Sequence, residues 1–156
     1  MNSKDRNILS ILQKDASTPI AKIADLVGLS TTPCWRRIQK LEKSGVIRER
    51  VVLLDAEKVG LGVTVFVGIK TDQHNAKWLD RFARRVCQLP EVLEFYRMSG
   101  ETDYLLRVVV ANIAGYDHFY KRLIEVADLS DVSSSFAMEQ IKYTTAIPVE
   151  QTAQGV

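Results

Sequence analysis

The chain has 156 residues, of which 46% are hydrophobic, and carries a net charge of +2. This length suits one domain or two small ones, and this hydrophobic content is enough for a packed core. The chain begins with polar residues and contains no apolar run long enough to span a bilayer, so we expect no secretory signal, no membrane span and a cytoplasmic location. Residues 1–50 carry ten Lys and Arg against five Asp and Glu, whereas residues 51–156 carry eleven against fourteen. The basic first third predicts a module that binds a polyanion.

Three short helices are predicted in this first third. Ser3 can cap the first helix. A second helix begins at Pro19, and its helical spacing of apolar residues stops at Gly28. A third helix begins almost at once at Ser30, and Gly45 follows its end. Two helices joined by a tight turn that contains Gly, the second of them basic, are typical of a helix-turn-helix.

The third predicted helix has two different faces. Cys34, Ile38 and Leu41 recur at the spacing of one buried face. The opposite side carries basic and hydroxyl side chains, and a basic face of this length matches the major groove of double-stranded DNA. Trp35 lies at the edge of the buried face, where we expect it to pad the core rather than to touch DNA. The side chains that we expect to contact DNA are Ser30, Thr31, Thr32, Arg36, Arg37, Lys40 and Lys43.

The segment after the third helix predicts a wing and a linker. Residues 46–54 are rich in β-branched residues and contain neither Pro nor Gly, so we expect a strand that makes the unit a winged helix-turn-helix. A polar segment over residues 55–62 contains two glycines and indicates a boundary. We therefore predict a DNA-binding domain over residues 1–50 and a linker strand over residues 51–62.

The remaining residues, 63–156, follow a different pattern. Strands are predicted over residues 63–69, 92–98, 104–110 and 132–138, with one extra extended segment over residues 142–149. Two amphipathic helices lie between these strands, one with Phe82 and Val86 inward and the other with Ile113 and Phe119 inward. The order β-α-β-β-α-β is that of a ferredoxin-like sandwich. The predicted fold class is therefore α+β.

Specific motifs run through the whole chain. They are Asp5 at the first helix, Leu29-Ser30 and Pro33-Cys34-Trp35-Arg36-Arg37 in the helix-turn-helix, Gly45-Val46-Ile47 at the wing, Gly100-Glu101-Thr102-Asp103-Tyr104 in the second domain, and Ile141-Lys142-Tyr143-Thr144-Thr145 near the end. On these motifs the chain resembles the Lrp/AsnC family of transcriptional regulators, over nearly all residues up to Pro148. The resemblance implies a sequence-specific DNA-binding regulator without a cofactor. It also implies an amino-acid-sensing domain that dimerises through its sheets, and homodimers that assemble into tetramers or octamers.

The resemblance identifies the loop between the second and third strands of the second domain as the effector site. Gly100 permits close approach of the backbone, whose N–H groups can bind a carboxylate, and Asp103 can hold the ammonium of a free amino acid. By composition alone, this is an ordinary turn in which Asp103 bonds the backbone. Met98 and the absence of basic residues over 99–106 favour a small apolar or sulfur-containing effector, with leucine, methionine and cysteine as candidates. The residues expected to form the site are Met98, Gly100, Glu101, Thr102, Asp103, Tyr104, Ser134 and Ser135.

Two other functions are open at this point. Some proteins that resemble this family decarboxylate siroheme with His and Arg side chains, so an enzyme on the same architecture is an alternative. The two histidines, His74 in a polar turn and His118 in the last helix, lie in no recognisable catalytic or metal-ligand spacing, so we predict neither kind of site. The other alternative is a thiol sensor that uses Cys34. Because Cys34 and Cys87 both lie within apolar helical patterns, we expect two reduced core thiols.

Overall fold

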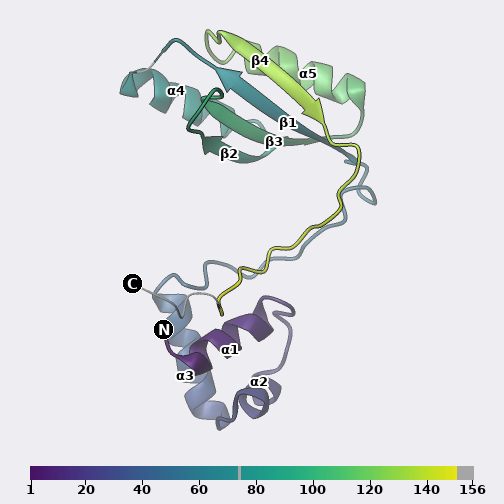
Figure 1. Cartoon of the computed structure of the whole chain (residues 1–156). Coiled ribbons are helices and arrows are strands. Elements are labelled where there is room, and N and C mark those ends of the chain that lie inside the picture. Colours follow the sequence, from purple (N-terminus) through teal and green to yellow (C-terminus); the bar gives the residue numbers. More distant parts are fainter. Residues whose placement is uncertain (74, 151–156) are drawn as a thin grey trace. The chain divides into compact units, whose positions relative to one another are not determined.

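The computed structural model describes residues 1–73 and 75–150, which group into two compact units (Figure 1). The first unit comprises Met1–Val52 and the described residues 142–150, and the second comprises Leu53–Ile141. The division after residue 52 falls within the expected linker. The described part of the C-terminal segment groups by its contacts with the first unit. His74 lies outside the described residues.

Three helices form the first unit: α1 (Ser3–Leu12), α2 (Ile20–Val27) and α3 (Thr31–Lys43). Their inward side chains build a closed core in which Ile8 and Cys34 have no exposed surface. The buried members are Ile8, Leu9, Ile23, Ala24, Val27, Cys34, Ile38 and Leu41. The three side chains predicted on the inner face of α3 are all among them, so that face is confirmed.

The helix ends follow the predicted signals, with one correction. Asn2, and not Ser3, caps α1, because its side chain accepts a hydrogen bond from the Asp5 N–H while the Asp5 carboxylate accepts one from the Asn2 N–H. Ser30 occupies the N-cap position of α3, as predicted. Gly28 ends α2 with a φ of 64°, a left-handed conformation that favours glycine. The chain can therefore turn sharply from α2 into α3.

Two predicted strands do not form in this chain. Residues 46–62, which include the expected wing and linker strand, and residues 142–149 are fully described and contain no strand. A β-strand is stable only when its backbone N–H and C=O groups pair with a neighbour, and β-branched composition alone supplies no neighbour. The apolar side chains of these segments are largely exposed, with Val52 at 84% and Ile147 at 68%. The prediction of strands there is wrong for the single chain.

The C-terminal segment is instead held by one side chain of the first unit. The Gln13 Nε2 donates a hydrogen bond to the Ile147 carbonyl at 3.1 Å, and the Gln13 Oε1 accepts one from the Ile147 N–H at 2.6 Å. Val149 packs against the core of the three helices. The Gln13 amide thus pairs with the backbone of Ile147 as one residue of a neighbouring strand would.

The second unit has the predicted β-α-β-β-α-β order. Its elements are β1 (Val63–Lys70), α4 (Ala76–Val86), β2 (Val92–Arg97), β3 (Tyr104–Val110), α5 (Ile113–Ile124) and β4 (Asp131–Phe136). The strands form one antiparallel sheet in the order β2-β3-β1-β4, with both helices against one face (Figure 1). Val65, Val67 and Ile69 of β1 are fully buried between the sheet and the helices. The ferredoxin-like α+β fold is confirmed.

The opposite face of the sheet is open within the single chain. Phe66 and Tyr96 lie on it with 41% and 50% of their surface exposed. Arg107 pairs with Glu94 on the same face at 2.6 Å, and this guanidinium holds the pKa of the Glu94 carboxyl below its ordinary value. Exposed aromatic side chains beside a polar pair on one sheet face are typical of a surface that another protein chain covers.

Two side chains of the second unit lie elsewhere than predicted. Ile113 is 67% exposed, because as the first residue of α5 it precedes the turns that pack on the sheet. Cys87 is exposed because it is the C-cap residue of α4, so the prediction of a second core thiol is wrong. In the described parts of the chain, no helix is both long and apolar enough to cross a membrane.

Candidate nucleic-acid interface and effector loop

The face of α3 that points away from the core is basic. Arg36, Lys40 and Lys43 are exposed on it, together with Thr32 in the first turn. Among the described residues, none of the three cations has an ion-pair partner. Lys40 and Lys43 lie in the last turn of α3, where cations interact favourably with the helix dipole. The predicted arc of positive charge is therefore accessible to an anionic ligand.

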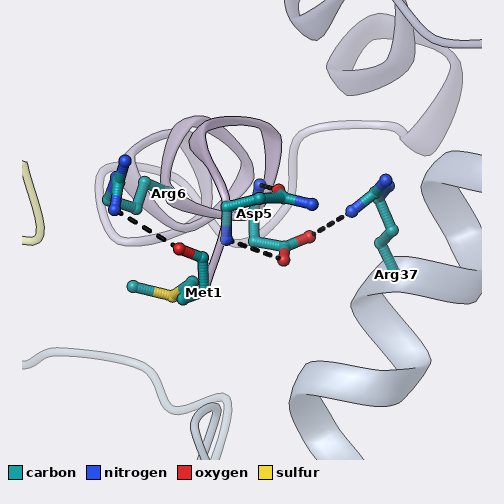
Figure 2. Close-up of polar contacts among 5 residues, drawn as sticks. Met1, Asp5, Arg6 and Arg37 are labelled. Atoms are coloured by element: carbon teal, nitrogen blue, oxygen red, sulfur yellow. Dashed lines mark hydrogen bonds and ion pairs between the residues drawn. The ribbon is translucent and has the colours of Figure 1, made fainter. Parts of the chain in front are cut away.

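Arg37 lies differently from the other predicted contacts. Its Nη1 donates to the Asp5 Oδ1 at 2.8 Å, and the side chains are 34% and 19% exposed (Figure 2). Asp5 belongs to the first turn of α1, so the pair links α1 to α3. In the sequence Asp5 stands out only as a family motif, and no pattern indicates this contact, which joins residues 32 positions apart.

Trp35 is not part of the core. Its side chain is 48% exposed, so the prediction that it pads the core is wrong. It lines a shallow hollow of about 280 Å³ on the surface of α3, together with Arg36, Gln39, Lys40 and Lys43. The indole thus gives the basic face an apolar wall.

The predicted effector loop is a closed hairpin turn between β2 and β3. The Met98 N–H donates to the Asp103 carbonyl at 2.8 Å, and Gly100 has a φ of 115°. The Asp103 carboxylate accepts a hydrogen bond from the Thr71 N–H at 2.8 Å, just after β1 ends. One carboxylate oxygen of Asp103 therefore binds the backbone of a neighbouring segment, at Thr71, a contact that the turn composition alone does not predict. Met98 and Glu101 are exposed beside it.

The strand alternation separates the other expected effector residues. Tyr104 is 6% exposed and packs against Phe82 in the core, with ring centroids 5.3 Å apart. The Ser134 hydroxyl hydrogen-bonds the Tyr116 hydroxyl on the helix side of the sheet, and burial raises the pKa of that phenol. Ser135 pairs with Phe66 in the register of the open face. Ser134 and Ser135 therefore face opposite sides, and one chain cannot present both to a single ligand.

One small residue beside the loop was missed in the sequence. A Cβ on Gly68 would lie 2.9 Å from the Ser133 Oγ and 3.4 Å from the Thr102 Cγ2. Gly68 therefore lets Ser133 and the loop residue Thr102 approach each other on the open face. The sequence does carry a signal for Ser133: the period of two along β4 places residues 133 and 135 on the same side of the sheet.

Comparisons with known proteins identify both units. Residues 1–48 match a winged helix-turn-helix DNA-binding family, and residues 64–147 match the Lrp/AsnC ligand binding domain. The chain belongs to the Lrp/AsnC family. It is 54% identical over 147 residues to the DNA-binding transcriptional activator DecR of Escherichia coli K12, covering 94% of this chain and 97% of that protein. It is 48% identical over 149 residues to the glutamate uptake regulatory protein of Zymomonas mobilis, covering 96% and 91%.

Solved structures of Lrp/AsnC proteins share this fold. An AsnC family transcriptional regulator from Agrobacterium tumefaciens is 61% identical and superposes with a TM-score of 0.94, covering 97% of this chain and 99% of that one. A transcriptional regulator from Neisseria meningitidis, solved in complex with L-methionine, is 32% identical with a TM-score of 0.92 and the same coverage. The chain is therefore a DNA-binding transcriptional regulator with a ligand-binding domain. The siroheme-decarboxylase alternative is set aside, because proteins this similar are regulators and not enzymes.

Proposed function

We propose that α3 enters the major groove of DNA and that its outward side chains make the contacts. The observation that carries this proposal is the exposed arc of Arg36, Lys40 and Lys43 on the side of α3 opposite the core. The N-terminal residues of a recognition helix reach base edges, so Ser30, Thr31 and Thr32 contact bases or nearby phosphates. The cations farther along α3 bind phosphates or guanine edges. Arg37 pairs with Asp5 and so stabilises the packing of α3 on α1 instead of contacting DNA.

The regulator works as a homodimer in this proposal. A single recognition helix covers too few base pairs for useful discrimination, whereas two helices read a pseudo-palindrome. The open sheet face that carries Phe66 and Tyr96 supplies the dimer surface, since covering it removes exposed apolar side chains from water. Dimers assemble further into tetramers or octamers. A relative, DecR, is a DNA-binding regulator of the bacterium Escherichia coli, and bacterial DNA lies in the cytoplasm, so the protein acts there in this proposal.

The effector is a small apolar or sulfur-containing amino acid that binds at the loop over residues 98–103. Backbone N–H groups around Gly100 bind its carboxylate, and the exposed Met98 contacts its side chain. Among leucine, methionine and cysteine, methionine is favoured, because the relative from Neisseria meningitidis was solved with L-methionine. Asp103 holds the ammonium while one of its oxygens stays on the Thr71 N–H. Thr102 lies near Ser133 around Gly68 on the open sheet face, which also carries Ser135, and a neighbouring chain completes the site there.

Binding of the effector shifts the equilibrium between assemblies. An amino acid at a site completed by another chain favours the assembly that contains this site, and the spacing between recognition helices changes with the assembly. Its influence is limited to its differential affinity for the two assemblies, about 1–3 kcal/mol. A modest change in operator affinity is therefore expected.

The experiment that tests the DNA surface compares Arg36→Ala with Arg84→Ala, an equal change of charge on the exposed side of α4. Duplexes selected by the full-length protein from a random-sequence pool are titrated at several salt concentrations. If Arg36 contacts a phosphate, its removal weakens binding and lowers the slope of log affinity against log salt by about one unit. Arg84→Ala leaves both unchanged. Wild-type affinity and slope in Arg36→Ala and Lys40→Ala would contradict the proposed surface.

A further inference from the structure

The unexplained feature of α3 is the indole of Trp35. Its neighbour Cys34 is fully buried, whereas Trp35 is 48% exposed and lies outside the core of the first unit. Burying a large aromatic side chain stabilises a fold, so a Trp left half in water contributes only part of this stabilisation to folding. It is available for a contact with another molecule.

The surroundings of Trp35 indicate which molecule this is. The other side chains that line its hollow are Arg36, Gln39, Lys40 and Lys43, all polar or basic. Three cations disfavour a basic or purely apolar protein partner and favour a polyanion. The hollow therefore fits a ligand that offers negative charge at its margin and an apolar group at its centre.

The major groove of DNA offers this combination. Phosphates border the groove, and the C5-methyl group of thymine is the apolar group on its floor. Trp35 is the fifth residue of α3, in the N-terminal half from which recognition helices reach base edges. Lys43 lies eight residues farther on, about 12 Å along the helix axis, which suits a phosphate at the border of the groove. The faces of stacked bases are covered in a duplex, so the indole meets base edges.

We infer that Trp35 is a specificity-determining residue that contacts the C5-methyl group of one thymine in each half-site. This inference rests on the proposed function of α3. It adds that the protein prefers a thymine, and therefore an A·T pair, at one position of the half-site. A methyl group that is taken out of water against an apolar surface changes affinity by about fourfold.

The test removes only the methyl groups. Duplexes selected by the full-length wild-type protein are resynthesised with each thymine replaced in turn by uracil, which keeps base pairing and lacks the C5-methyl group. Affinities are measured for the wild type, Trp35→Ala and Trp35→Leu, with Trp78→Phe as a control on the other tryptophan. Thermal unfolding establishes that each variant is folded, and the Leu variant retains an apolar side chain at the position.

The expected result is a coupling between one thymine and Trp35. Uracil at this position lowers the affinity of the wild type and of Trp78→Phe about fourfold and leaves that of Trp35→Ala unchanged, while Trp35→Leu shows an intermediate loss. Equal losses in wild type and Trp35→Ala at every thymine would overturn the inference, as would preferential binding of single-stranded DNA through the indole. If selection enriches no duplex, the proposed function itself fails. An enriched duplex without coupling refutes only the role of Trp35.

Discussion

Removing the Arg37 guanidinium should weaken the first unit rather than the DNA contacts of α3. The Arg37 Nη1 lies 2.8 Å from the Asp5 Oδ1, and the two side chains are 34% and 19% exposed (Figure 2). Ion pairs at exposed positions contribute about 0.2–1 kcal/mol. We expect a coupling of about 0.5–1 kcal/mol here, in the upper part of this range, because the contact is a hydrogen bond and Asp5 is mostly shielded from water.

A double-mutant cycle is needed because Asp5 also takes part in the cap of α1. Asp5→Ala removes the contact with the Asn2 N–H as well as the ion pair, so its own effect exceeds the coupling. Comparing Asp5→Ala, Arg37→Ala and the double variant isolates the pair. The chain contains two tryptophans, so a Trp78→Phe background leaves Trp35 as the fluorescent probe of the first unit during urea unfolding.

Two measurements would refute this role of Arg37. The coupling should fall in about 1 M salt, where the screening length is about 3 Å, and Arg37→Ala should keep the wild-type slope of DNA affinity against salt. A coupling below about 0.2 kcal/mol, together with a slope reduced by about one unit, would show that Arg37 is a phosphate contact instead.

The fragment of residues 53–141 should sediment as a dimer, because it keeps the open sheet face, and a monomer would contradict the proposed dimer surface. Asp103→Ala should lower methionine affinity in calorimetry by about tenfold or more and leave DNA affinity without methionine unchanged. Asp103→Asn keeps an acceptor for the Thr71 N–H, so full methionine affinity in this variant would refute the role of the charge. Iodoacetamide at neutral pH should modify Cys87 and spare Cys34, because burial raises the pKa of the Cys34 thiol and keeps it protonated; mass spectrometry showing both modified would revive the thiol-sensor alternative.

The sequence alone predicted which side chains are buried wherever the local period of one helix or strand decides this. Cys34 and Ile38 recur at helical spacing and are buried, and Val65 and Val67 alternate along β1 and are buried. In each case one element packs against one core, so the period alone decides which side chains lie inside. The role of Gly28 was equally predictable from the sequence, because a residue in the left-handed conformation is needed to end α2 before α3 begins.

Contacts between distant residues could not be predicted from these patterns. The pairing of Arg37 with Asp5 depends on how α3 crosses α1, and no periodicity encodes that angle. Trp35 adjoins buried Cys34 in the sequence, and only the crossing of the helices decides that its indole projects into water. Ser134 and Ser135 were grouped as one site, although a strand sends neighbouring side chains to opposite faces. That last error was avoidable from the sequence.

The remaining differences between the predicted and the observed structure share one physical cause. The segment around Val52 and the segment around Ile147 have strand-forming composition, yet both are exposed and form no strand, and Phe66 is exposed on an unpaired sheet face. Each of these features requires a neighbouring backbone or an apolar surface that a single chain does not provide. In the proposed dimer a second copy supplies such surfaces. If so, part of the stabilising free energy lies between chains, and an effector that binds there can change DNA affinity without altering α3 itself.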